Sequence, residues 1–248
     1  PLIIKGCRQC GKTFSVLEFA RKNYKHTVYL NFFENPDYAS VFSGSLEIDN
    51  IVMMLSALLG KDAVFEPGQT ILILDEIQCG MGRTGHYFAW QAYGVQPDIM
   101  TCAKALGCGV PVGAFVLNKK AAAASLKPGD HGTTYGGNPF VCAAVSKVFD
   151  IFEKDQILSH VQGLTPYLEE KLDELVAKHE CAEVRRGKGF MQGIVIKGRP
   201  VGDVVKKALA KGLLVISAGS DVLRLVPPLV ITKEDIDKMA EILDECME

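Results

Sequence analysis

Apolar runs and helical spacing alternate along the first third of the chain. An apolar run at Leu2–Ile4 leads into a glycine-containing loop, after which apolar residues recur with helical spacing through Phe14, Leu17 and Phe19. The further elements predicted here are a strand at 26–32, a helix at Ile48–Leu59 and an apolar strand at 71–74 that runs into Asp75-Glu76. Strands that alternate with helices in this way predict an α/β fold.

The same two periodicities continue to the end of the chain. An apolar strand at Asp98–Ala103 precedes Lys104, and a glycine-rich loop at His131–Pro139 opens a long helix that runs through Val148. Amphipathic helices then alternate with strands: helices at Leu168–His179, Val201–Lys211 and Lys233–Met247, and strands at Gly189–Ile196, Leu213–Ser217 and Val222–Leu229. This last part is predicted to form a small C-terminal α+β domain.

Composition and charge narrow the classes of partner. The 248 residues hold 27 Lys and Arg against 29 Asp and Glu, a net charge of -2 without a basic patch, so no nucleic acid partner is expected. No apolar stretch reaches the roughly 18 residues that cross a bilayer, and Pro1–Lys5 lacks the features of a signal peptide. We therefore expect a cytoplasmic protein without a membrane partner, which binds small molecules or another copy of itself.

The cysteines favour reduced thiols over a metal site. The chain contains 8 Cys, scattered along its length, as is typical of small apolar residues in a reducing compartment. One Cys-x-x-Cys pair, Cys7 and Cys10, lacks a second pair at zinc-binding spacing. No metal centre is therefore predicted outside a nucleotide site.

The loop after the first strand carries a complete phosphate-binding signature. Its G-x-x-x-x-G-K-T pattern places Gly6 and Gly11 where backbone N–H groups can turn toward phosphate oxygens, with Lys12 as a point charge and Thr13 as a Mg²⁺ ligand. The apolar strand ending in Asp75 and Glu76 would add a second Mg²⁺ contact and a group that polarises water. Residues 1–78 thus resemble the opening of a bacterial AAA-like P-loop ATPase and imply ATP and Mg²⁺, but the later elements of that family are not recognisable.

A different chemistry is indicated from Asp75 onward. Lys104 follows an apolar strand and begins a glycine-rich turn, a position where a partly desolvated amine could hold pyridoxal 5'-phosphate (PLP) covalently. A buried carboxylate beside the ring of PLP can stabilise its protonated pyridine nitrogen. The loop that opens the helix at Pro139 suits an anion, and Arg224, alone in an apolar strand pattern, suits a carboxylate.

From Leu74 onward the sequence resembles the class III PLP-dependent aminotransferases of the acetylornithine and ornithine type. The matching motifs are Asp75-Glu76-x-Gln78, the Lys104 turn, the loop with Thr134 and the strand with Arg224. The resemblance implies PLP fold type I and transamination between an acetylornithine- or ornithine-like amino acid and the 2-oxo acid 2-oxoglutarate. It also implies Lys104 as the catalytic lysine and a homodimer.

The resemblance assigns the other motif residues to ligands. Asp75 would face the ring nitrogen, Gln78 the ring hydroxyl, Thr134 the PLP phosphate of the neighbouring subunit, and Arg224 the substrate α-carboxylate. Arg83 also matches a family motif, and we interpret it as structural. The Asp75 carboxylate and the Lys104 amine are expected roughly 6 to 10 Å apart, the span of a pyridoxal ring.

The two resemblances meet at Leu74–Gln78, a string that both families could supply. No Gly-, Ser- or Pro-rich linker separates them, which predicts a chimeric chain rather than two tethered enzymes. The predicted parts are a P-loop segment at 1–78, an aminotransferase large-domain part at 74–148 and a small domain at 149–248. Three functions follow: transamination weakened by missing upstream contacts, ATP binding and hydrolysis, or a chain that does neither.

Overall fold

The computed structural model describes part of the chain, namely residues 25–26, 48–60, 64–66, 73–92, 94, 96–125 and 134–248. The predicted P-loop, with Gly6, Gly11, Lys12 and Thr13, and the strand predicted at 26–32 apart from His26, lie outside these residues. The chain divides into two compact units, each discontinuous in sequence: residues 1–75, 90–102 and 113–136 form one, and residues 76–89, 103–112 and 137–248 form the other. Each unit is described by itself.

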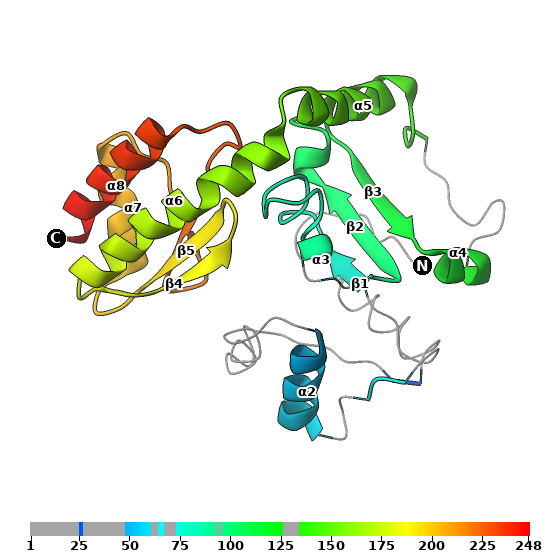
Figure 1. Ribbon diagram of the computed structural model, residues 1–248, viewed down its shortest axis with the longest axis horizontal. Coiled ribbons are helices and arrows are strands. Elements are labelled where there is room, and N and C mark those ends of the chain that lie inside the picture. The colour runs from blue at the N-terminus through cyan, green and yellow to red at the C-terminus, as the bar shows by residue number, and fades with distance from the viewer. Residues whose placement is uncertain are drawn as a thin grey trace. The chain divides into compact units, whose positions relative to one another are not determined.

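The first unit contains a three-stranded sheet in the order β1-β2-β3 (Figure 1). Its strands are β1 Ile73–Asp75, β2 Ile99–Ala103 and β3 Gly113–Leu117, and the helices α2 Ile48–Leu59 and α4 Lys119–Ser125 belong to the same unit. Strands β1 and β2 are parallel, with Asp75 opposite Thr101. The helix predicted at Ile48–Leu59 is confirmed with the same bounds, and the parallel pair agrees with the expected α/β class.

The second unit is built on a four-stranded antiparallel sheet in the order β4-β5-β7-β6; Figure 1 labels β4 and β5. The strands are β4 Ala182–Lys188, β5 Met191–Ile196, β6 Ile216–Ala218 and β7 Val222–Leu225. The helices are α5 Pro139–Lys154, α6 Ile157–Lys178, α7 Val201–Ala210 and α8 Lys233–Met247, and the short α3 Ala89–Ala92 begins in this unit. Strand β4 was not predicted; the helix at Lys233–Met247 is confirmed with the same bounds.

The core of this second unit lies between helices and sheet. Helix α6 buries residues spaced three or four apart, which form one apolar stripe against β4 and α8: Ile157, Val161, Leu164, Leu168, Leu172 and Leu175. Helix α8 also contacts α7, which packs on β6 and β7. The predicted α+β organisation of the C-terminal part is therefore what the structure shows. None of the described helices is both long and apolar enough to cross a membrane.

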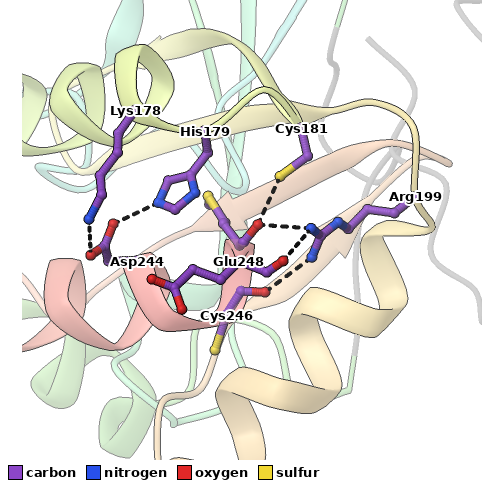
Figure 2. Close-up of polar contacts among 8 residues, drawn as sticks. Lys178, His179, Cys181, Arg199, Asp244, Cys246 and Glu248 are labelled. Carbon is purple, nitrogen blue, oxygen red and sulfur yellow. Dashed lines mark hydrogen bonds and ion pairs between the residues drawn. The ribbon is translucent and has the colours of Figure 1, made fainter.

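Both ends of α8 are closed by hydrogen bonds. At its start Thr232 and Asp235 form a capping box, in which the Thr232 side chain accepts from the Asp235 N–H. At its end the Arg199 guanidinium donates to the backbone carbonyls of Cys246, Met247 and Glu248 (Figure 2). Such carbonyls have no partner within a helix, and a cation at this end also interacts favourably with the helix dipole.

One carboxylate joins α8 to the end of α6. Asp244 accepts a hydrogen bond from Lys178 through Oδ2, and its Oδ1 lies 2.6 Å from Nε2 of the buried His179 (Figure 2). Because a carboxylate only accepts, Nε2 of His179 carries the proton. The hydrogen bond from Lys178 is the main cause, and that from His179 the second, of a pKa of Asp244 below its ordinary value.

We expect the substitution Asp244→Asn to lower the thermal unfolding midpoint at pH 7. A carboxylate whose pKa is depressed on folding stabilises the folded chain above its unfolded pKa of about 3.9, and that contribution disappears as pH falls through the lower folded value. The difference between wild type and variant should therefore shrink below about pH 4. Thermal unfolding of both chains from pH 7 to pH 3 measures it.

The matched control for this substitution is Asp150→Asn. Asp150 lies 3.9 Å from Lys147 on an exposed part of α5, and exposed ion pairs contribute little. The Asp150→Asn variant should have the same thermal unfolding midpoint as the wild type at every pH. A difference between wild type and Asp244→Asn that persists unchanged at pH 3 would contradict the linkage to the Asp244 carboxylate.

Candidate functional site

Lys104 begins the turn that follows β2. Its backbone is left-handed, with φ of 48°, and it starts a 3-10 helix over Lys104–Leu106 that closes when Gly107 N–H donates to the Lys104 carbonyl at 3.1 Å. A residue with a side chain seldom adopts this conformation, and where one does, a function is a reasonable hypothesis. The turn that was predicted around Lys104 is therefore present, with an uncommon backbone at the lysine itself.

The turn requires glycine at position 107. A Cβ built on Gly107 would lie 2.3 Å from the Val110 carbonyl oxygen and 2.6 Å from Cγ1 of Val112. Contacts this short force the chain to shift, so the backbone after Lys104 is closely fitted. The turn is thus shaped by packing as well as by the strand before it.

The expectation that Lys104 is partly desolvated was wrong for the chain as the structure describes it. The side chain is exposed. The reason lies in its position: β2 buries Ile99, Met100 and Cys102, whereas Lys104 comes after the last strand residue and has left the buried layer. Its amine is accessible from solvent.

Asp75 is the last residue of β1, where the sequence placed it. The parallel register with Thr101 puts the ends of β1 and β2 at one edge of the sheet, which is where open α/β sheets hold ligands. The Asp75 side chain is outside what the structure describes, and Asp75 and Lys104 belong to different compact units. The expected distance between their charged groups stays a prediction.

Glu76, the next residue, is buried with 3% of its surface exposed. Its Oε2 accepts hydrogen bonds from the Ala89 N–H and from Sγ of Cys79, both at 3.0 Å. Ala89 is the first residue of α3, so the carboxylate serves an N–H that has no partner within that helix. This use of Glu76 could not be predicted from its place in an Asp-Glu pair.

Gln78 and Arg224 are brought together although 146 positions separate them. Nη1 of Arg224 donates to Oε1 of Gln78 at 3.0 Å, and both residues belong to the second unit. Strand alternation explains the direction of the arginine: Leu223 and Leu225 are buried at 0% and 3%, so the half-buried Arg224 lies on the other face. Two residues that were assigned separately to ligands are thus neighbours.

Arg83 fixes the segment after Gln78 to the C-terminal sheet. Its guanidinium donates to the carbonyls of Phe190, at 3.3 Å, and Pro227, while its own carbonyl accepts from the Phe190 N–H at 2.8 Å. Burial lowers the pKa of Arg83. These contacts match the structural role that the sequence suggested, and they hold the turn that carries Gln78.

Thr134 lies in an exposed turn over 134–137. The chain then enters α5, which Asn138 caps by accepting from the Val141 N–H at 3.0 Å, with Pro139 at the first helical position. The helix start predicted from the glycine-rich loop is therefore confirmed, and the helix continues to Lys154. Nothing in the described residues tests the role of Thr134 toward a phosphate.

Comparison with known proteins bears on the whole of this arrangement. Residues 62–247 match the family model described as Aminotransferase class-III. The acetylornithine aminotransferase of Caldanaerobacter subterraneus subsp. tengcongensis is 45% identical over 184 residues, which are 74% of this chain and 46% of that protein. The chain belongs to the class-III aminotransferases.

Other class-III aminotransferases agree in sequence and in fold. The acetylornithine aminotransferase of Bacillus subtilis is 41% identical over 82% of this chain and 52% of its own length. The solved structure of acetylornithine aminotransferase from Elizabethkingia anophelis has a TM-score of 0.67 at 30% identity, over 79% of this chain and 49% of that one. The solved structure of ornithine delta-aminotransferase from Plasmodium falciparum has a TM-score of 0.69 at 32% identity, over 81% of this chain and 51% of that one. The chain spans about half the length of these relatives.

A second family model overlaps the first. Residues 1–82 match a model described as AAA domain, so residues 62–82 are matched by both families. The predicted join at Leu74–Gln78 lies inside this overlap, and the join itself stays a prediction. The Bacillus subtilis alignment covers 82% of this chain and therefore also extends upstream of residue 62. The similarity to aminotransferases thus begins before Leu74, where the resemblance was expected to start.

Proposed function

We propose that this chain is the lysine-bearing part of a PLP-dependent aminotransferase that transfers an amino group between an acetylornithine- or ornithine-like amine and 2-oxoglutarate. The observation that carries the proposal is the hydrogen bond between Arg224 and Gln78. The family resemblance assigns Gln78 to the ring hydroxyl of PLP and Arg224 to the substrate α-carboxylate. Their hydrogen bond supports a common site for these two ligands. The names of the similar proteins support the choice of substrate.

The residues present fit PLP. The Lys104 amine is open to solvent, and the Gln78 amide keeps its nitrogen as a donor beyond its bond to Arg224. Bound PLP supplies an electron sink for charge that develops at the substrate α-carbon. In this proposal Lys104 would hold the cofactor covalently and, once displaced by the substrate amine, its free amine would move the proton at that carbon. Asp75 would face the ring nitrogen, and Arg224 would bind the substrate carboxylate.

A homodimer is part of the proposal. Thr134 would donate to the PLP phosphate held by a second subunit. Large apolar side chains that follow Thr134 are exposed in the single chain, Tyr135 at 81% and Phe140 at 74%, which supports their being covered in a dimer. We further propose that PLP is retained weakly, since residues 1–61 precede the match to the class-III aminotransferase model and are matched by the AAA domain model.

A second candidate is nucleotide binding, favoured by the AAA match over residues 1–82. It would use Gly6, Gly11, Lys12 and Thr13, with Mg²⁺ held by Thr13 and Asp75 and water polarised by Glu76. The burial of Glu76 and its bond to the Ala89 N–H weigh against that use of Glu76. They support an Asp-Glu strand folded as in an aminotransferase.

Visible absorbance separates the two candidates. PLP held by a lysine absorbs visible light, whereas nucleotides do not. We expect the purified chain to turn yellow on titration with PLP, to lose colour on dialysis, and to unfold at a higher temperature only when PLP is well above its dissociation constant. A chain that gains no visible band with PLP, but is stabilised by ATP with Mg²⁺, would overturn the proposal in favour of the second candidate.

A further inference from the structure

The contact between Gln78 and Arg224 fixes the orientation of an amide. An arginine side chain has only donors, so the end of the Gln78 amide that faces Nη1 must be its oxygen. The amide nitrogen is then directed elsewhere, and within the described residues it makes no hydrogen bond. The amide oxygen of Gln78 is therefore the acceptor for Arg224, and its amide nitrogen remains available as a donor.

The charge of Arg224 is left uncompensated by this partner. Gln78 is neutral, and in the part of the chain that the structure describes no carboxylate pairs with Arg224. A carboxylate at position 78 would satisfy the same guanidinium donor, but it would also neutralise the charge and compete with any anionic ligand. A neutral acceptor holds the arginine in place without that competition.

The surroundings of Arg224 favour a fixed position. Leu223 and Leu225 anchor β7 in the core. Arg224 is paired with Gly193 on β5 and with Ile216 on β6, so β7 has a hydrogen-bonded strand on each side. The backbone is therefore held firmly, and the long arginine side chain is steadied at its far end by Gln78.

We propose that Gln78 is a positioning residue that sets the carboxylate selectivity of Arg224, an inference that rests on the proposed function. Its amide oxygen orients the guanidinium and leaves the positive charge for a carboxylate ligand. Its amide nitrogen, on the other side, is the donor available to a second ligand group. The identity of residue 78 thus tunes an anion site on a strand 146 positions away.

The test is the binding of succinate, an unreactive dicarboxylate, to the full chain by titration calorimetry. Gln78→Glu should weaken succinate binding about tenfold at pH 7.5, because the new carboxylate pairs with Arg224. Gln78→Leu removes the acceptor without adding charge and should weaken it only about threefold, through lost orientation. Arg224→Lys, which loses the planar fork, should weaken binding about as much as Gln78→Glu.

A pH series distinguishes positioning from a structural role. As pH falls toward the ordinary carboxyl pKa of about 4.3, the introduced carboxylate protonates, so the ratio of wild-type to Gln78→Glu affinity should shrink. A structural defect would leave that ratio constant. The matched control is Gln156→Glu, the same change at an exposed position of the same unit, which should bind as the wild type does.

Two outcomes overturn the inference. If Gln78→Glu binds succinate like the wild type while Arg224→Lys is weakened, Gln78 does not position the arginine, and the proposed function stands. If the wild type binds no succinate, Arg224 is not an anion site. In that case the attachment of PLP to Lys104 still reports separately on the proposed function.

Discussion

Replacing Lys104 by alanine is expected to abolish the borohydride-stable attachment of PLP to this chain. The wild type, reduced with borohydride in the presence of PLP, should carry the label on the peptide that contains Lys104. The left-handed turn presents this amine directly after β2, and it is exposed. Lys104→Arg should also lose the label, because a guanidinium stays protonated and does not attack a carbonyl. Peptide mapping by mass spectrometry measures the result.

The matched control is Lys206→Ala, which removes a lysine whose side chain is 84% exposed on α7. Its labelling at Lys104 should equal that of the wild type. Label spread over surface lysines with none at Lys104 would show that the assignment of the catalytic lysine is wrong. Lys104→Ala removes an exposed side chain, so unfolding should not explain a loss of label in that variant.

Phe190→Ala is expected to lower the free energy of unfolding by about 3 to 5 kcal/mol, the usual cost of removing a buried phenyl ring. Phe190 lies in the turn that joins β4 to β5 and is fully buried, and its backbone exchanges hydrogen bonds with Arg83. The cavity should therefore also loosen the segment that carries Gln78. Urea unfolding followed by fluorescence or circular dichroism measures the change.

Leu214→Ala is the control, because that side chain is 84% exposed and exposed substitutions usually change stability by less than about 0.5 kcal/mol. Equal losses in the two variants would contradict the burial that the structure gives Phe190. A loss of stability in Phe190→Ala together with weaker succinate binding would show that packing around Phe190 supports the turn that carries Gln78.

The elements that the sequence predicted best carry local signals. Helix α8 has a capping box at Thr232 and apolar residues at helical spacing, and its bounds were predicted without error. Strand β4 was missed because Ala182–Lys188 is largely charged and mostly exposed, so no apolar alternation marks it. It is a strand because it pairs with β5, and that pairing is not a property of its own residues.

The candidate site shows the same limit. Lys104, Gln78 and Arg224 could each be selected from a motif and its neighbours. The contact of Gln78 with Arg224 could not, since it depends on how β7 packs beside a turn 146 positions earlier. The burial of Glu76 was likewise hidden, because its partner, the Ala89 N–H, is a backbone group that any residue supplies. Motifs indicate chemistry, and packing decides which groups are already engaged.

The boundary between the compact units has a consequence for inheritance. The second unit begins at Glu76, within the string Leu74–Gln78 that both families could supply. A recombination at that string would pass the whole of this unit, including Gln78, Lys104 and Arg224, from one parent to the descendant without a break. Crossovers at any point between Ala89 and Gly137 would divide it between two parents. The predicted join would thus lie where a new upstream partner can be exchanged while the contacts within the unit are kept.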